Sequence, residues 1–143
     1  MLKNTPKILS PELLKILCEM GHGDEIVIAD ANFPSENLGK RVIRADGISG
    51  AAMLGAVLSV IPLDTYADTN CVLMELTPSD VGRVFPTIWD DYRKIAAEKD
   101  GNDKFSSVER FAFYERTKNA YAVIATGEEA IYANIILKKG VIV

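Results

Sequence analysis

The feature that most constrains the fold of this chain is a short, uninterrupted apolar run at residues 25–29. After Glu25 the run reads Ile-Val-Ile-Ala, and it contains no further polar position. A strand with one face in water alternates apolar and polar residues, because successive side chains point to opposite faces. A strand without that alternation is covered on both faces, as in a sheet packed between layers of helices. The run therefore favours an α/β fold.

Helical patterns flank this strand. Ser10 is a good N-cap, Pro11 suits the first helical position, and Gly21 marks the end of a helix over 10–21. A second helix is predicted from Ser49 to Ile61, before Pro62. Further helices are predicted from about Pro86 to 100 and over 110–118, and further strands at 41–44, 71–74, 120–126 and 131–137.

The C-terminal part of the chain predicts a β-hairpin. The strands at 120–126 and 131–137 are separated by Gly127-Glu128-Glu129, which is typical of a turn. Residues 32–39 are predicted to be an irregular loop. No repeat or linker divides the sequence, and 143 residues is the size of one ordinary domain. We therefore expect a single compact α/β domain over residues 1–143, with a sheet flanked by helices and a C-terminal β-hairpin.

The composition argues against several classes of binding partner and indicates the cellular compartment of the protein. The net charge is −4 without a cluster of Lys and Arg, which argues against nucleic acid and anionic membranes as partners. Cys18 and Cys71 lack CxxC spacing, so we expect two buried free thiols rather than a disulfide or a zinc site. The N-terminus has no signal-peptide pattern, and no apolar run reaches the length of a membrane span. We expect a cytoplasmic protein.

His22, the one histidine of the chain, is a candidate acid–base residue. It lies between Gly21 and Gly23 in a predicted turn that leads into the apolar strand. Histidine is the side chain best suited to exchange protons near neutral pH. An exposed turn histidine without a catalytic role explains the same pattern.

Asp30 follows the apolar strand, at the carboxyl end where open α/β sheets place ligand sites. A carboxylate that only caps the next loop is the alternative. His22 and Asp30 lie at opposite ends of the strand, on the order of 25 Å apart if the segment is extended. That separation argues against one small ligand touching both residues of the same subunit. Turns at both ends of the strand would shorten the distance, and a subunit interface would remove the difficulty.

Tyr132 and Asn134 are two residues apart in a predicted strand and thus face the same side. A phenol and an amide are neutral donors and acceptors, well suited to sugar hydroxyls, although solvent-facing polar pairs are also common. Arg110 is either an anchor for a polar ligand or a surface arginine. One histidine and two separate cysteines provide few ligands for a metal ion, so a metal site is not expected.

Seven segments of the chain form a recognisable series of motifs: 10–15, 19–25, 29–34, 42–47, 110–116, 126–128 and 132–141. In this order, and over nearly the whole chain, they resemble the fucose mutarotase and ribose pyranase family. The arginine-aromatic motif at 110–116 and the C-terminal motif at 132–141 are more similar to the fucose branch than to the ribose branch.

The resemblance implies a function and a set of roles. It implies an isomerase that interconverts the α and β anomers of L-fucose by acid–base ring opening, without a cofactor or a metal. His22 matches the catalytic histidine of the family, and Asp30, Arg110, Tyr132 and Asn134 match its substrate-binding residues. Ala133 stands where the family has a glycine. The resemblance also implies a homo-oligomer, such as a decameric ring, with sites near subunit interfaces.

Other functions remain open on the sequence. A D-ribose pyranase keeps the enzyme class and changes the sugar. A non-catalytic monosaccharide-binding protein that assists uptake predicts binding without faster anomer exchange, and a purely structural ring protein predicts neither.

Overall fold

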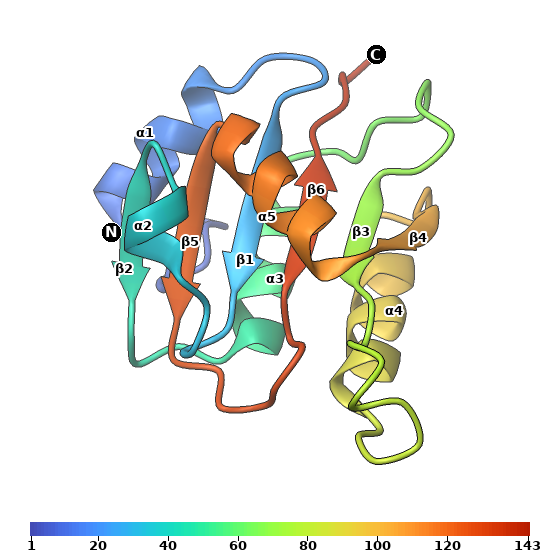
Figure 1. Ribbon diagram of the computed structural model, residues 1–143. Coiled ribbons are helices and arrows are strands. Elements are labelled where there is room, and N and C mark those ends of the chain that lie inside the picture. Colours follow the sequence, from blue (N-terminus) through green and yellow to red (C-terminus); the bar gives the residue numbers. More distant parts are fainter.

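A mixed six-stranded sheet organises the chain in the computed structural model, which describes all residues 1–143 (Figure 1). The strands lie in the order β2-β5-β1-β6-β3-β4. β6 is antiparallel to both of its neighbours, and all other neighbouring pairs are parallel. The strands are β1 (Glu25–Ala29), β2 (Val42–Ala45), β3 (Cys71–Met74), β4 (Phe105–Val108), β5 (Ala122–Thr126) and β6 (Ile135–Lys138).

Helices cover both faces of the sheet (Figure 1). One face is covered by α1, α3 and α4, and the other by α2 and α5. The bounds are α1 (Pro11–Glu19), α2 (Ser35–Leu38), α3 (Gly50–Leu58), α4 (Ile88–Lys99) and α5 (Arg110–Asn119). None of these helices combines the length and the apolar character that crossing a membrane requires.

The pleat of β1 divides the apolar core into two layers. Ile26 and Ile28 pack in the layer under α1, α3 and α4, whereas Val27 and Ala29 pack in the layer under α5. All four side chains are fully buried. The prediction from the uninterrupted apolar run is thus confirmed: the strand is covered on both faces, and the domain has the expected α/β architecture.

The predicted C-terminal hairpin is wrong in its pairing. β5 and β6 are both present and run in opposite directions, but β1 lies between them and pairs with each. The connection over residues 127–134 is longer than a tight turn, so it can pass the end of β1. β1 is apolar from Ile26 to Ala29, and its place between two neighbouring strands buries this run completely.

Two elements were not predicted. The loop expected at 32–39 contains the single-turn helix α2. Pro34 and Gly39 lie directly on either side of it, and both residues are typical of loops, so the sequence pattern did not predict a helix. β4 lies at the edge of the sheet, and its Phe-Ser-Ser-Val sequence is only partly buried. The helix predicted over 10–21 ends earlier, at Glu19, with Met20 rather than Gly21 as its C-cap.

The topology gathers several loops at one edge of the sheet, the lower edge in Figure 1. The residues that follow β1, β3 and β4 leave from this edge. Because β6 runs in the opposite direction, the residues that precede it lie at the same edge. Asp30 and Arg110 belong to the first group, and Tyr132 and Asn134 to the second.

Candidate functional site

A pocket of about 340 Å³ opens at this carboxyl edge. It contains four of the residues singled out in the sequence, Asp30, Arg110, Tyr132 and Asn134. The remaining lining residues are Asn32, Phe33, Met74, Thr77, Ser79, Asp80, Tyr114 and Ile131. The pocket thus combines two carboxylates, a guanidinium and an aromatic wall.

Asp30 and Asn134 form a reciprocal pair on the pocket floor. The Asp30 amide donates to Asn134 Oδ1 at 2.8 Å, and Asn134 Nδ2 donates to Asp30 Oδ2 at 3.0 Å. The amide of Asn32 donates to the other carboxylate oxygen at 3.0 Å. Both side chains are buried and have little freedom, so the pair presents fixed oxygens to the pocket.

The environment of Asp30 has two opposing effects on its ionisation. Burial disfavours the charged form and raises the pKa of Asp30 above its ordinary value. Backbone amides of Asn32, Ala133 and Phe33 and the amide of Asn134 donate to the carboxylate and offset part of that rise. Asp30 is therefore a desolvated carboxylate surrounded by donors.

Tyr132 is held in place by its backbone and by its hydroxyl. Its φ of 61° is in the left-handed region, which side-chain-bearing residues rarely adopt. Trp89 Nε1 donates to the Tyr132 carbonyl at 2.8 Å and fixes this turn. The Tyr132 hydroxyl donates to Asp80 Oδ2 at 2.5 Å and accepts from the Thr77 amide at 3.2 Å.

The prediction that Tyr132 and Asn134 lie within a strand is wrong. Both residues precede β6, which begins at Ile135, because the left-handed turn at Tyr132 cannot continue a strand. Ala133, between them, is fully buried, and its carbonyl accepts a hydrogen bond from the Tyr92 hydroxyl at 3.0 Å. Tyr132 and Asn134 nevertheless line the same pocket.

Arg110 stands at the mouth of the pocket, at the first residue of α5. Its Nε donates to the Tyr114 hydroxyl at 3.0 Å, and its guanidinium lies 5.3 Å from the centre of the Tyr114 ring. Tyr114 packs edge-on against Phe33 at 5.5 Å. Arg110 itself is exposed, so its remaining N–H groups are available to a ligand.

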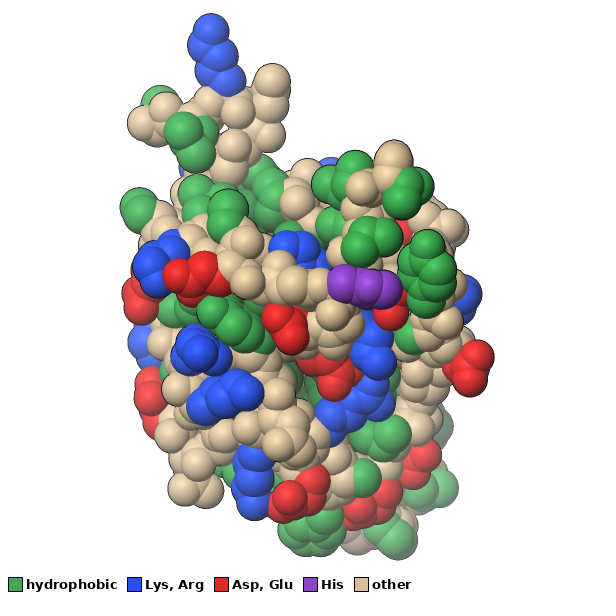
Figure 2. Space-filling view, turned by 90° about the horizontal axis from the view of Figure 1, so that it is seen from above, with side chains coloured by type: hydrophobic (Ala, Val, Ile, Leu, Met, Phe, Trp, Pro, Cys, Tyr) green, Lys and Arg blue, Asp and Glu red, His purple; other side chains and the backbone are tan.

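His22 lies outside this pocket. It precedes β1, whereas Asp30 follows it, so the two residues are at opposite ends of the strand. In the view from above, the His22 side chain lies on the face at the other end of the sheet (Figure 2). It borders a different hollow of about 370 Å³, and the two cavities share no lining residue.

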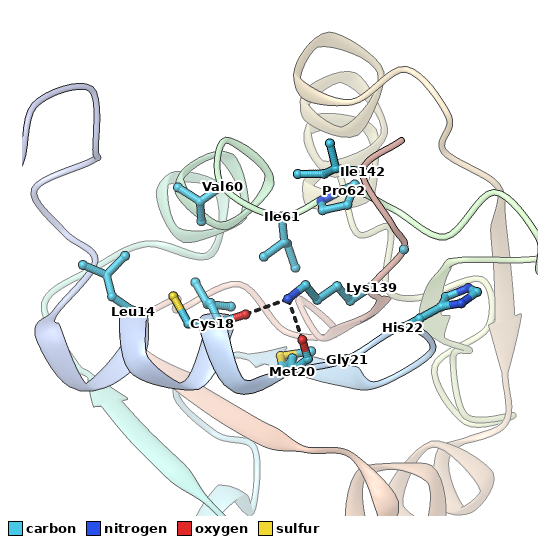
Figure 3. Close-up of a pocket in the computed structure, with 12 residues that line it drawn as sticks. Leu14, Cys18, Met20, Gly21, His22, Val60, Ile61, Pro62, Lys139 and Ile142 are labelled. Carbon is cyan, nitrogen blue, oxygen red and sulfur yellow. Dashed lines mark hydrogen bonds between the residues drawn. The ribbon is translucent and has the colours of Figure 1, made fainter.

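The turn that carries His22 is attached to the end of β6 by Lys139. The Lys139 ammonium donates to the carbonyls of Leu17 and Met20, at 2.8 and 2.6 Å, at the end of α1 (Figure 3). The Lys139 backbone also pairs with Gly23 and Asp24. These bonds fix the loop that carries His22. The side chain of His22 projects from this loop and is 45% exposed.

Thr77 and Asp80 also line the pocket and were not predicted as site residues. They lie after β3, at the same carboxyl edge that made Asp30 a candidate, so the polar run from Thr77 to Asp80 was the available signal. No three His, Cys, Asp or Glu side chains are grouped so that they hold a metal ion.

The chain is similar to known proteins over nearly its whole length. The model of the RbsD / FucU transport protein family matches residues 3–142. A fucose mutarotase of Mus musculus is 52% identical over 143 residues, which cover 97% of this chain and 94% of that protein.

Two solved structures have a similar fold. The fucose mutarotase of Streptococcus pneumoniae in complex with L-fucose has a TM-score of 0.92 and 47% identity, covering 99% of this chain and 100% of that chain. RbsD of Bacillus subtilis in complex with D-ribose is more distant, with a TM-score of 0.72, 25% identity and full coverage of both chains (100% each). The extent of these matches shows that the chain belongs to the RbsD / FucU family.

Proposed function

We propose that this protein is an isomerase that interconverts the α and β anomers of L-fucose. The observation that carries the proposal is the grouping of Asp30, Arg110, Tyr132 and Asn134 in one pocket. These residues come from three separate parts of the chain. A relative with 47% identity is a fucose mutarotase in complex with L-fucose.

The pocket offers a complementary surface for this sugar. The Asp30 carboxylate accepts hydrogen bonds from sugar hydroxyls, and Arg110 donates to sugar oxygens. Tyr132 and Asn134 supply a phenol and an amide beside them. L-fucose carries a methyl group in place of one hydroxymethyl, and Phe33, Met74 and Ile131 provide apolar surface for it.

Anomer exchange needs two proton transfers and no covalent intermediate with the protein. A proton is removed from the anomeric hydroxyl and another is delivered to the ring oxygen, so the C1–O5 bond breaks and an open aldehyde forms. Rotation about the C1–C2 bond and reclosure on the other face of the carbonyl give the second anomer. We assign one of these transfers to His22; general acid–base catalysis of this kind supplies about 10²- to 10⁴-fold.

His22 reaches the sugar only from a second subunit. Within one chain, β1 separates His22 from the Asp30 pocket. A homo-oligomer that places the His22 turn of one subunit over the pocket of the next completes the site. Exposed apolar side chains at both ends of the sheet support such a contact: Tyr66 is 75% exposed near His22, and Phe111 is 66% exposed beside Arg110. A ring such as a decamer satisfies this head-to-tail arrangement.

We place the protein in the cytoplasm. Cys18 and Cys71 are both free thiols; Cys71 is buried as expected, but Cys18 is exposed, so the expectation of burial is wrong for Cys18. Exposed free thiols are typical of proteins kept in a reducing compartment.

Saturation-transfer NMR on equilibrated L-fucose tests the function. Catalytic amounts of protein should accelerate exchange between the α and β anomeric protons, and His22→Ala should abolish the acceleration while circular dichroism stays unchanged. D-ribose, measured under the same conditions, tests the pyranase alternative. Saturable fucose binding without faster exchange would instead support a non-catalytic binding protein.

A further inference from the structure

A turn after β3 contacts the hydroxyl of Tyr132. The Tyr132 oxygen lies 2.5 Å from Asp80 Oδ2 and 3.2 Å from the amide nitrogen of Thr77. The hydroxyl of Thr77 donates to the same Asp80 oxygen at 3.3 Å. These contacts join parts of the chain that are 52 and 55 positions apart, and all three residues line the pocket at the carboxyl edge. The tertiary fold therefore brings a carboxylate to the phenol inside the candidate site.

The position of Asp80 is fixed by the backbone of its own turn. Its amide donates to the Thr77 carbonyl at 2.9 Å. Its carbonyl accepts from the amides of Arg83 and Val84, at 3.0 and 2.9 Å. None of these bonds involves Tyr132, so the turn determines where the carboxylate lies independently of the phenol.

Helix α4 holds the backbone of Tyr132. Trp89 Nε1 donates to the Tyr132 carbonyl at 2.8 Å, and the Tyr92 hydroxyl donates to the next carbonyl, that of Ala133, at 3.0 Å. Tyr92 and Ala133 are fully buried. One element thus fixes the backbone at Tyr132 and another fixes its hydroxyl, so the phenol has a defined orientation in the pocket.

The partners of the Tyr132 hydroxyl determine what it offers to a ligand. A carboxylate only accepts hydrogen bonds, so the single hydrogen of the phenol points to Asp80. The Thr77 amide only donates, so it occupies one of the two lone pairs of the phenol oxygen. One lone pair remains for the pocket. Tyr132 therefore presents an acceptor to the ligand, although a free phenol can equally donate.

We propose that Asp80 is a positioning residue for Tyr132: it takes the hydroxyl hydrogen, so that the phenol oxygen accepts a hydrogen bond from one hydroxyl group of the sugar. The inference rests on the proposed function only in taking L-fucose as the ligand, and it does not require catalysis. It makes Asp80 a determinant of specificity, because the pocket then selects a hydroxyl group over a group of similar size that cannot donate.

Fluorinated sugars test this polarity, because fluorine is close in size to a hydroxyl group but cannot donate a hydrogen bond. Calorimetric titration of the full-length protein gives Kd for L-fucose and for analogues that each carry fluorine in place of one ring hydroxyl. At the hydroxyl that contacts Tyr132, fluorine should weaken binding to the wild type about 10-fold. Tyr132→Phe identifies this hydroxyl, since fluorine at that position should then weaken binding less than about 2-fold.

Substitutions of Asp80 separate the acceptor from the rest of the turn. Asp80→Leu leaves the phenol hydrogen free to turn to the pocket, so the effect of fluorine should fall below about 3-fold at that position and at no other. Asp80→Asn keeps an acceptor oxygen and should retain the effect seen in the wild type. Asp68→Leu makes the same change as Asp80→Leu at an exposed aspartate outside the pocket and should leave every Kd unchanged.

Three results would overturn the role of Asp80. The first is a set of fluorine effects that Tyr132→Phe leaves unchanged at every position. The second is an Asp80→Leu protein that keeps the full effect of fluorine. The third is an Asp80→Leu protein that binds L-fucose and every analogue more weakly by the same factor, with a shifted emission of Trp89, the single tryptophan of the chain. That result would mean that the turn had lost its structure, whereas the proposal expects unchanged emission.

The proposed function fails in a different measurement. Absence of anomer exchange in saturation transfer contradicts the mutarotase and does not alter the pattern of dissociation constants. Absence of any sugar binding contradicts both hypotheses.

Discussion

At the scale of single residues, Asp30 is buried, and its proposed role requires the charged form. In that role the Asp30 carboxylate accepts hydrogen bonds from sugar hydroxyls, so kcat/KM for anomer exchange should fall as the pH falls through the pKa of Asp30. Because burial raises that pKa, the acid limb should lie above the ordinary value of 3.8. The pH profile of saturation transfer measures this limb. A limb at or below 3.8, or one that coincides with unfolding by circular dichroism, contradicts it.

The raised pKa of Asp30 also makes the stability of the fold depend on pH. The folded-state pKa of Asp30 lies above its unfolded value, so folded protein binds the proton more tightly. The ionised carboxylate therefore subtracts stability above the folded pKa, and this penalty disappears as the pH falls below the unfolded value.

Tyr132 offers a second test at this scale. Tyr132→Phe removes a hydroxyl that bonds Asp80 and Thr77 but keeps the ring. We expect KM for L-fucose to rise about 3- to 10-fold, the magnitude of one lost hydrogen bond, with kcat nearly unchanged. Tyr121→Phe is the matched control, because its hydroxyl donates to Glu19, away from the pocket. An unchanged KM in Tyr132→Phe would exclude a contact between the hydroxyl and the sugar.

At the scale of elements, Lys139 joins the end of β6 to the end of α1. Lys139→Met keeps the aliphatic stem and loses two charge-assisted hydrogen bonds to helix carbonyls (Figure 3). The free energy of unfolding should fall by about 2–3 kcal/mol in urea denaturation. Lys138→Met, one residue away, removes an ammonium that makes no hydrogen bond and should change stability by less than about 0.5 kcal/mol. Equal effects of the two substitutions would contradict a capping role for Lys139.

The elements also show what local sequence determines. The run at 25–29 predicted a doubly covered strand, and β3 was predicted at the residues where it occurs, 71–74, because buried strands are recognisable from apolar residues alone. β4 was missed since an edge strand needs no such run. The hairpin was wrong because β1, a strand distant in the sequence, pairs with both β5 and β6 and separates them. Local patterns identify elements, and competition between elements determines their neighbours.

In the candidate site, too, some residues could be predicted from local sequence and others could not. Asp30 was predicted from a rule about the ends of strands, and that rule also covers Thr77 and Asp80, which follow β3. Asp64, whose carboxylate lies 3.0 Å from His22 Nε2, had no comparable signal, because this contact depends on the tertiary path of the chain after Pro62.

At the scale of the whole molecule, the separation of His22 from the Asp30 pocket predicts a site shared between two subunits. His22→Ala and Asp30→Asn chains are each expected to be inactive alone. Co-expressed with different tags and purified as mixed oligomers, they should recover about a quarter of the wild-type activity, since random mixing pairs an intact His22 with an intact Asp30 at that frequency. Saturation transfer measures the recovery.

A double variant provides the control for this experiment. When one chain carries both His22→Ala and Asp30→Asn and is mixed equally with wild type, a shared site again gives about a quarter of the activity, whereas a site within one chain gives about half. Two results together would establish the shared site: recovered activity in the first mixture, and about a quarter of the wild-type activity in the second. Each catalytic site would then contain His22 from one subunit and Asp30 from another. No recovery in the first mixture with half in the second would place both residues in one chain, and the His22 loop would then have to move far from the position that Lys139 and Asp64 give it.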